Sequence, residues 1–245
     1  MRVAVLSDIH GNLPALEAVL ADMVERGPFD ATVVAGDLVW AGPWPGEVVD
    51  RIRDLGVVTI QGNTDAFLGH EPEDPPQDKN EAHFAPLRIW CADRLGPERV
   101  AYLLGLPFSH RIVPAAGHDL LVVHANPVDQ ERPISPYMSD ADLDELLGPA
   151  QDCNWEVLAF GHLHIPYHKH WRDRLLVDAS SVGLPMDGDH RAAYAILTWD
   201  GTAWQIEHPR VPYAVPVVVR EMQTGGMPRG KHFADRLLRA SYNQR

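Results

Sequence analysis

Asp8 and His10 are the first residues of the chain whose types and spacing could do chemistry. They follow residues 3–6, an unbroken apolar run that predicts a short strand buried on both faces. On an extended backbone, side chains two residues apart project from the same side. The carboxylate and the imidazole could therefore reach one metal ion.

The same arrangement recurs at four later points, where a polar cluster follows an apolar run. The clusters and the strands predicted before them are Asp37 after 31–35, Asn63 after 57–60, His124 after 120–123, and His162 with His164 after 157–160. Each residue alone could be a helix cap, a turn residue or a surface group. Together, oxygen and imidazole ligands at five strand ends, with no thiolate among them, predict a dinuclear metal site.

The segments between these clusters indicate how the ligands are brought together. Helical spacing predicts a helix over 13–26 that ends at Gly27-Pro28, and a second helix over 47–55 capped by Gly56. Strands alternating with helices favour βαβ units and a parallel sheet. Ligands of such sheets bind beyond the carboxyl ends of the strands, where all the clusters are expected to lie.

The second half of the chain is expected to be more antiparallel. Residues 82–104 predict two helices broken near Gly96-Pro97, and 140–147 predict a short helix, while 71–80 are rich in Pro and charge and predict an exposed loop. The further predicted strands are 175–177, 193–199, 204–207 and 215–219.

The chain is expected to form a single domain over 1–245, with 210–245 as a C-terminal appendage. In this appendage, 233–240 predict a basic helix with one narrow apolar face. It could be a packed terminal helix, a dimer contact or a flap over the site.

Composition excludes several classes of protein. The 245 residues carry 21 Lys and Arg against 34 Asp and Glu, for a formal net charge of −13. Because no basic stripe appears, binding of extended nucleic acid by phosphate neutralisation is not expected. No apolar stretch has the length of a membrane span, and no secretory signal is evident. With only two distant cysteines, Cys91 and Cys153, we expect a cytoplasmic protein without disulfides or membrane association.

The ordered motifs resemble those of the calcineurin-like metallophosphoesterase superfamily, in particular its small bacterial and archaeal phosphodiesterase branch. They cover most of residues 1–200 and read Asp8-Ile9-His10, Gly36-Asp37, Gly62-Asn63-Thr64-Asp65, Val123-His124, Gly161-His162-Leu163-His164 and Ser181-Val182-Gly183. The resemblance implies an α/β fold, a four-layer α/β/β/α sandwich of two mixed sheets flanked by helices.

The resemblance also implies a site for two divalent metal ions. The ligands of the first ion would be Asp8, His10, Asp37 and His164, and those of the second Asp37, Asn63, His124 and His162. Asp37 would bridge the ions, and a hydroxide between them would attack phosphorus in line. Imidazole and carboxylate ligands accept several metals, of which we expect Mn or Fe, with Zn, Ni or Co as alternatives.

Thr64 departs from the family pattern, which often has a histidine there to protonate the leaving alkoxide. A hydroxyl is not a useful general acid near neutral pH. His83, His190 or a water could supply the proton instead.

We expect a phosphoesterase, with phosphodiesters favoured, that acts on small phosphate esters contacted by Asn12 and Asn63. The alternative is a non-catalytic scaffold or a module that binds a phosphate ligand on the same fold, and a homo-oligomer remains open. Because all seven ligands are present, we favour the enzyme; loss of ligands would favour the alternative.

Overall fold

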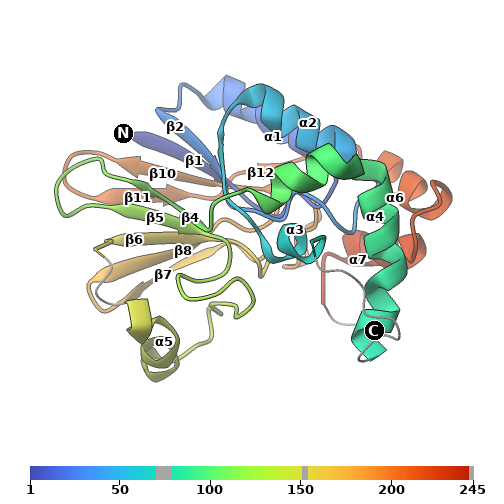
Figure 1. The fold of residues 1–245 in the computed structure, drawn as a ribbon. Helices are drawn as coiled ribbons and strands as arrows, with labels where there is room; N and C mark the ends of the chain where they lie inside the picture. The colour runs from blue at the N-terminus through green and yellow to red at the C-terminus, as the bar shows by residue number, and fades with distance from the viewer. Residues whose placement is uncertain (70–78, 151–153, 243–245) are drawn as a thin grey trace.

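The computed structural model describes residues 1–69, 79–150 and 154–242 and, within them, two five-stranded sheets that lie face to face (Figure 1). In spatial order, the first sheet contains β11 (Trp204–Glu207), β10 (Ala195–Trp199), β1 (Arg2–Leu6), β2 (Ala31–Val34) and β3 (Val58–Thr59). The second contains β4 (Ser109–Ile112), β5 (Leu120–Val123), β6 (Val157–Phe160), β8 (Arg174–Asp178) and β7 (Tyr167–Trp171).

Both sheets are mixed. In the first, β1, β2 and β3 run parallel, and β10 pairs antiparallel with β1. In the second, β5, β6 and β8 run parallel, and β4 and β7 are antiparallel edge strands. A separate pair joins β9 (Ala192–Ala193) to β12 (Arg210–Val211). Parallel strands at the centre of each sheet place their carboxyl ends at one edge.

Strand β1 shows how the layers are built. Val3 and Val5 pack between the two sheets, whereas Ala4 and Leu6 pack on the opposite face against helices. This is the strand buried on both faces that its apolar run predicted. Helices α1 (Leu13–Arg26) and α2 (Pro45–Leu55) cover the first sheet, and α5 (Asp140–Leu147) covers the second (Figure 1). The fold is therefore the predicted four-layer α/β/β/α sandwich.

The helices follow the predicted signals closely. Asn12 caps α1, and Gly56 ends α2 in the left-handed conformation. Helix α4 (Lys79–Leu104) is interrupted at Gly96, where φ is 69° and ψ is 166°, so it consists of two helical segments as expected. Of the predicted loop 71–80, residues 71–78 lie outside the described residues, and α4 begins at Lys79.

The predicted strand over 215–219 is wrong, because these residues begin helix α6 (Val215–Thr224). Pro216 lies in the first turn of α6, where a missing N–H costs nothing. Val215, Val218 and Met222 face the core at helical spacing, so the valine run has a period near 3.6 rather than 2.

The other differences concern short elements. The predicted strand 193–199 is two strands, β9 and β10, that belong to different sheets. Strands β4, β7 and β12 and the five-residue helix α3 (Asn63–Phe67) were not predicted. In the part of the chain that the structure describes, no helix has both the length and the apolar character needed to cross a membrane.

Candidate metal centre

All five predicted strand ends meet at one edge of the sandwich. The loops after β1 and β2 are joined by backbone hydrogen bonds, because the Asp8 N–H donates to Gly36 O at 3.0 Å and the His10 N–H donates to Asp37 O at 3.0 Å. In the second sheet, the Gly161 N–H donates to His124 O at 2.8 Å. The site is thus built on paired backbone rather than on free loops.

The backbone of the site is held in an uncommon conformation. Five of the seven predicted ligands have positive φ, namely Asp8 (54°), His10 (50°), Asp37 (54°), His162 (70°) and His164 (60°). Non-glycine residues rarely adopt this region, and such strain gathers at functional sites. At these five residues, the left-handed turn sends the side chain inward, over the carboxyl ends of the strands.

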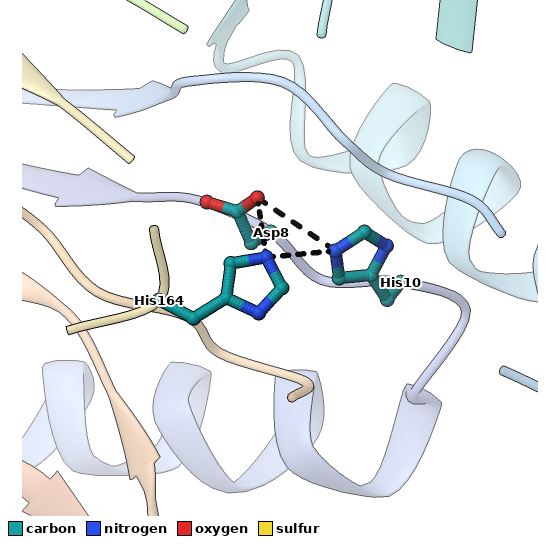
Figure 2. A group of neighbouring side chains, drawn as sticks. All are labelled: Asp8, His10 and His164. Atoms are coloured by element: carbon teal, nitrogen blue, oxygen red, sulfur yellow. Dashed lines mark hydrogen bonds and ion pairs between the residues drawn. The ribbon is translucent and has the colours of Figure 1, made fainter. Parts of the chain in front are cut away.

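The first group of ligands consists of Asp8, His10 and His164 (Figure 2). The Nε2 atoms of His10 and His164 lie 3.1 Å apart, and Oδ1 of Asp8 lies 3.0 Å from Nε2 of His164. Both imidazoles are nearly buried, and Asp8 is fully buried. Figure 2 shows the three side chains converging on one point.

The protonation of the two rings follows from their other nitrogen atoms. His10 Nδ1 lies 3.1 Å from Val39 O, and His164 Nδ1 lies 2.6 Å from Leu184 O. A carbonyl only accepts, so each Nδ1 carries the hydrogen, and each Nε2 of a neutral ring presents a lone pair. Burial and the neighbouring His164 lower the pKa of His10 to about 4, which keeps its ring neutral.

With both Nε2 atoms unprotonated, no hydrogen lies between the inward-facing atoms of the first group. Oδ1 of Asp8 is buried and accepts no hydrogen bond within the described residues, although Nε2 of His164 lies beside it. Three electron-pair donors therefore face one another, an arrangement that is repulsive in itself. A cation among them removes the repulsion, so the donor set fits a divalent metal ion.

The second group lies around Asp37 and His124. His124 Nε2 is 3.5 Å from Oδ1 of Asp37, 2.9 Å from Oδ1 of Asn63 and 3.2 Å from Nδ1 of His162. The hydrogen on His124 Nδ1 points to Ala35 O at 2.8 Å, which again turns Nε2 inward. Burial lowers the pKa of His124, but the carboxylates Asp37 and Asp8 outweigh it and raise that pKa above its ordinary value.

Asp37 stands between the two groups. Its Oδ2 lies 3.8 Å from Nε2 of His10 in the first group, and its Oδ1 lies 3.5 Å from Nε2 of His124 in the second. Oδ1 also accepts the backbone N–H of Thr64 at 2.9 Å. The carboxylate thus offers one oxygen to each group, as a bridging ligand requires. The structure brings together all seven predicted ligands.

At two positions, a glycine allows the backbone to lie directly against a ligand carboxylate. Gly62 lies against the carboxylate of Asp37, and Gly161 lies against the carboxylate of Asp8 and the hydroxyl of Ser7. A Cβ atom at either position would collide with these oxygen atoms. The glycines in the two motifs are therefore required by close packing on the ligands.

Asn12 has a structural position apart from the ligands. Its side chain is fully buried, its Oδ1 accepts the Ala15 N–H at 3.2 Å, and its Nδ2 donates to Gly183 O at 2.8 Å. A contact to Tyr213 occupies Nδ2 further, at 3.2 Å. Because these bonds use its amide, we assign Asn12 to the support of the loop and do not propose it as a substrate contact.

Three residues that sequence reasoning gave no role support the ligands. Asp65 is fully buried and accepts the N–H groups of Leu38 and Gly62 at 3.0 Å each, which ties the loops after β2 and β3 together. Ser181 Oγ donates to Asp8 O at 2.7 Å. Asp65 and Ser181 both lie in the motifs quoted above. Their position in these motifs could have predicted a supporting role.

Glu131 is the third. Nδ2 of Asn63 donates to its carboxylate at 3.3 Å, which turns Oδ1 of Asn63 toward His124. No spacing in the sequence links residues 63 and 131, so nothing could have found this contact.

A pocket of about 250 Å³ lies over the ligands. It is lined by His10, Asp37, Trp40, Ala41, Asn63, Thr64, Phe84, His162, His164, Leu184, Phe233, Arg236 and Tyr242. The hydroxyl of Thr64 donates to Val39 O at 3.3 Å. Trp40 lines the pocket, whereas His190 is exposed outside it and the side chain of His83 lies outside the described residues.

The model of the calcineurin-like phosphoesterases matches residues 1–178, a span that contains every ligand. This chain belongs to the calcineurin-like phosphoesterase family. It is 31% identical over 243 residues to an uncharacterized protein of Methanocaldococcus jannaschii, which covers 92% of this chain and 93% of that protein. It is 28% identical over 210 residues to the phosphodiesterase YfcE of Escherichia coli K12, with 82% and 89% covered.

Solved structures agree with this assignment. The chain is similar to a metallophosphoesterase from Sphaerobacter thermophilus, with a TM-score of 0.75, 30% identity, and coverage of 98% of this chain and 100% of the other. A hypothetical protein from Pyrococcus horikoshii shares the fold, with a TM-score of 0.83 and 22% identity over 99% of both chains.

Proposed function

We propose that this phosphoesterase is a phosphodiesterase that works with two divalent metal ions. The observation that carries the proposal is the convergence of unprotonated imidazole nitrogens and buried carboxylate oxygens, illustrated by the 3.1 Å between Nε2 of His10 and Nε2 of His164. The relative YfcE is named a phosphodiesterase, which supports the choice of diesters.

The proposed ligands divide between the two ions as the two groups do. Asp8, His10 and His164 would hold the first, Asn63, His124 and His162 would hold the second, and Asp37, which lies between the two groups, would serve both. Two such ions neutralise phosphate charge and activate a water for in-line attack on phosphorus. The ligand set does not distinguish Mn, Fe, Zn, Ni and Co.

The residues of the chain then have separate tasks. The Nδ1–H groups of His10, His124 and His164 fix their rings on backbone carbonyls, so the donor set is organised before substrate binds. Thr64 lines the pocket but offers no titratable group to the leaving oxygen. The reaction is therefore expected to be fast only for leaving groups that depart without a proton.

The test is a metal-reconstituted activity panel over phosphomonoesters and phosphodiesters. Chelated protein should be inactive, and reconstitution with Mn or Fe should restore hydrolysis of diesters and bring close to two ions per chain. Mutation of a residue that hydrogen-bonds a metal ligand typically lowers metal affinity or activity about 10–100-fold. Asp37→Asn alters the shared ligand itself, so it should lower activity by more than this.

The panel also decides the alternative. A wild type that binds two ions and a phosphate ligand but hydrolyses no ester with any of the five metals would be a binding module on the same fold. Wild-type activity and metal content in Asp37→Asn would contradict the bridging role of Asp37.

A further inference from the structure

One wall of the pocket comes from the part of the chain beyond the family match. Helix α7 (Gly230–Arg239) supplies Phe233 and Arg236 to the pocket lining, and Tyr242, three residues after the end of the helix, also lines the pocket. The family model ends at residue 178, so these side chains lie outside the matched span.

This wall is fixed by the core. Phe233 and Leu237 are 3% and 0% exposed, and they pack with Leu184 and Met186, which lie on the segment that follows Ser181. The Gly188 N–H donates to Ala240 O at 2.8 Å, which ties the end of α7 to the same segment. The place of Arg236 on α7 is therefore set by core packing and by a backbone hydrogen bond at the end of the helix.

Arg236 has no acidic partner in the described part of the chain. Its Cζ atom lies 5.2 Å from the centre of the Tyr242 ring, and one guanidinium N–H approaches Sδ of Met186 at 4.0 Å. Other arginines contrast with it, since Arg51 pairs with Glu17 at 2.6 Å and Arg99 pairs with Asp50 at 2.5 Å.

An unpaired, half-buried arginine is unusual in a chain with a net charge of −13. Burial lowers the pKa of Arg236; Tyr242 opposes this in part, and Arg229 lowers the pKa further, so the position carries an unfavourable charge. Guanidinium groups bind carboxylates and phosphates through paired hydrogen bonds. The cation is thus available to an anion that enters the pocket.

Tyr242, which lies near both a predicted ligand and Arg236, indicates which anion that is. The Tyr242 ring lies 6.4 Å from the ring of His164, and its hydroxyl donates to Leu163 O at 3.0 Å. The Cζ atom of Arg236 lies 5.2 Å from the centre of this same ring, so Tyr242 neighbours both Arg236 and the predicted ligand His164. A phosphate bound at the ligands would leave Arg236 to a neighbouring group of the substrate.

We propose that Arg236 is a specificity-determining residue that binds a second acidic group of the substrate, a few bonds from the phosphorus atom. This rests on the proposed function. The protein then prefers phosphodiesters whose non-leaving arm carries a carboxylate or a phosphate over those with a neutral arm.

The experiment compares two diesters with the same p-nitrophenolate leaving group. One carries a 3-carboxypropyl arm, and the other carries the methyl ester of that arm, which has the same shape without the charge. Both are assayed with metal-reconstituted wild type, Arg236→Gln, Arg236→Lys and the matched control Arg239→Gln, which changes an exposed arginine of α7 outside the pocket.

Arg236→Gln removes hydrogen bonds to a charged group, so it should lower kcat/KM for the carboxylate ester about 10–100-fold. For the methyl ester, it should lower kcat/KM less than about threefold. Arg236→Lys should fall between, because it keeps the charge but loses the paired geometry. Arg239→Gln should match the wild type on both. An equal loss on both esters, or no loss on either, would overturn the assignment.

Failure of the proposed function is distinguishable from failure of this inference. If the wild type hydrolyses neither ester, the two esters become stable ligands, and their dissociation constants are measured by calorimetry. The inference predicts that the wild type binds the carboxylate ester at least tenfold more tightly than the methyl ester and that Arg236→Gln removes the difference. Equal affinities in the wild type would overturn it.

Discussion

The floor and the wall of the pocket are built by opposite means. On the floor, five of the seven predicted ligands, Asp8 and Asp37 among them, have left-handed backbone at strand ends, and electron-pair donors face one another. On the wall, Arg236 stands on a regular helix held by apolar packing, and it has no carboxylate partner among the described residues. The floor is arranged for cations and the wall for an anion, so one pocket can hold a metal-bound phosphate beside a second acidic group.

Replacing Gly161 by Ala should have the largest effect and should damage the floor alone. The added Cβ would collide with the carboxylate of Asp8, so metal affinity should fall by more than the about 10–100-fold typical of an altered support. Metal content by elemental analysis and diesterase activity should fall together.

Gly105→Ala is the control, since its Cβ would make only an ordinary contact at 3.4 Å. Full metal content in Gly161→Ala would show that the close approach is not required.

Thr64→His should add to the floor the histidine general acid that the family pattern often has at this position. A general acid is typically worth about 10²–10⁴-fold, mostly for alkoxide leaving groups. The variant should gain up to this factor on alkyl diesters and almost nothing on nitrophenyl diesters. Val39 O, which accepts the Thr64 hydroxyl, is the acceptor for the new ring, because the carboxylate of Asp65 is occupied by backbone N–H groups.

The measurement is the rate against leaving-group pKa for both proteins. A steep negative slope in wild type and a flatter one in the variant are expected; parallel slopes would place the proton donor elsewhere.

Leu237→Ala should weaken the wall without touching the floor. Leu237 is fully buried, and truncation of such a leucine costs about 2–5 kcal/mol of folding free energy. In a chain of this length, each kcal/mol lowers Tm by roughly 2–4 °C. Calorimetry should show this loss of Tm, while metal content of the folded protein stays at the wild-type value. Loss of metal below the transition would show that wall and floor are one unit.

The smallest effect is expected at the surface loop beneath the wall. The Arg191 guanidinium hydrogen-bonds the Asp189 carboxylate, which lowers the pKa of Asp189 to about 2. A lowered carboxyl pKa stabilises the fold above pH 4, and this contribution disappears as the pH falls from about 4 toward 2. Since the pair is exposed to solvent, Asp189→Asn should cost less than about 1 kcal/mol at pH 7.

Urea unfolding of both proteins between pH 7 and 3 measures the difference, which should shrink at the acid end. A difference that grows toward low pH would contradict the assigned sign.

Local patterns predicted much of the floor from the sequence. Apolar runs of four or five residues predicted β1, β2, β3, β5 and β6, and the polar residues after them gave all seven predicted ligands. These predictions succeed because a buried parallel strand must be apolar and its carboxyl end must face the edge where ligands bind. The resemblance supplied the division of the ligands between two ions and the order of the layers.

Predictions failed where a local pattern fits two structures. The run at 215–219 reads as a strand, and only its packing beside α7 showed that Val215, Val218 and Met222 form one helical face. The two short strands of the pair β9–β12 carry no pattern of their own and exist because distant segments meet.

The sequence by itself determined which residues can bind metal and the edge of the sheet at which they lie, because both follow from residue type and strand period. Only the tertiary structure decided that Glu131 orients Asn63 and that Arg236 and His164 line one pocket. The residues of these two pairs are 68 and 72 positions apart in the chain, respectively. Their geometry depends on how helices and sheets pack, which no local spacing encodes.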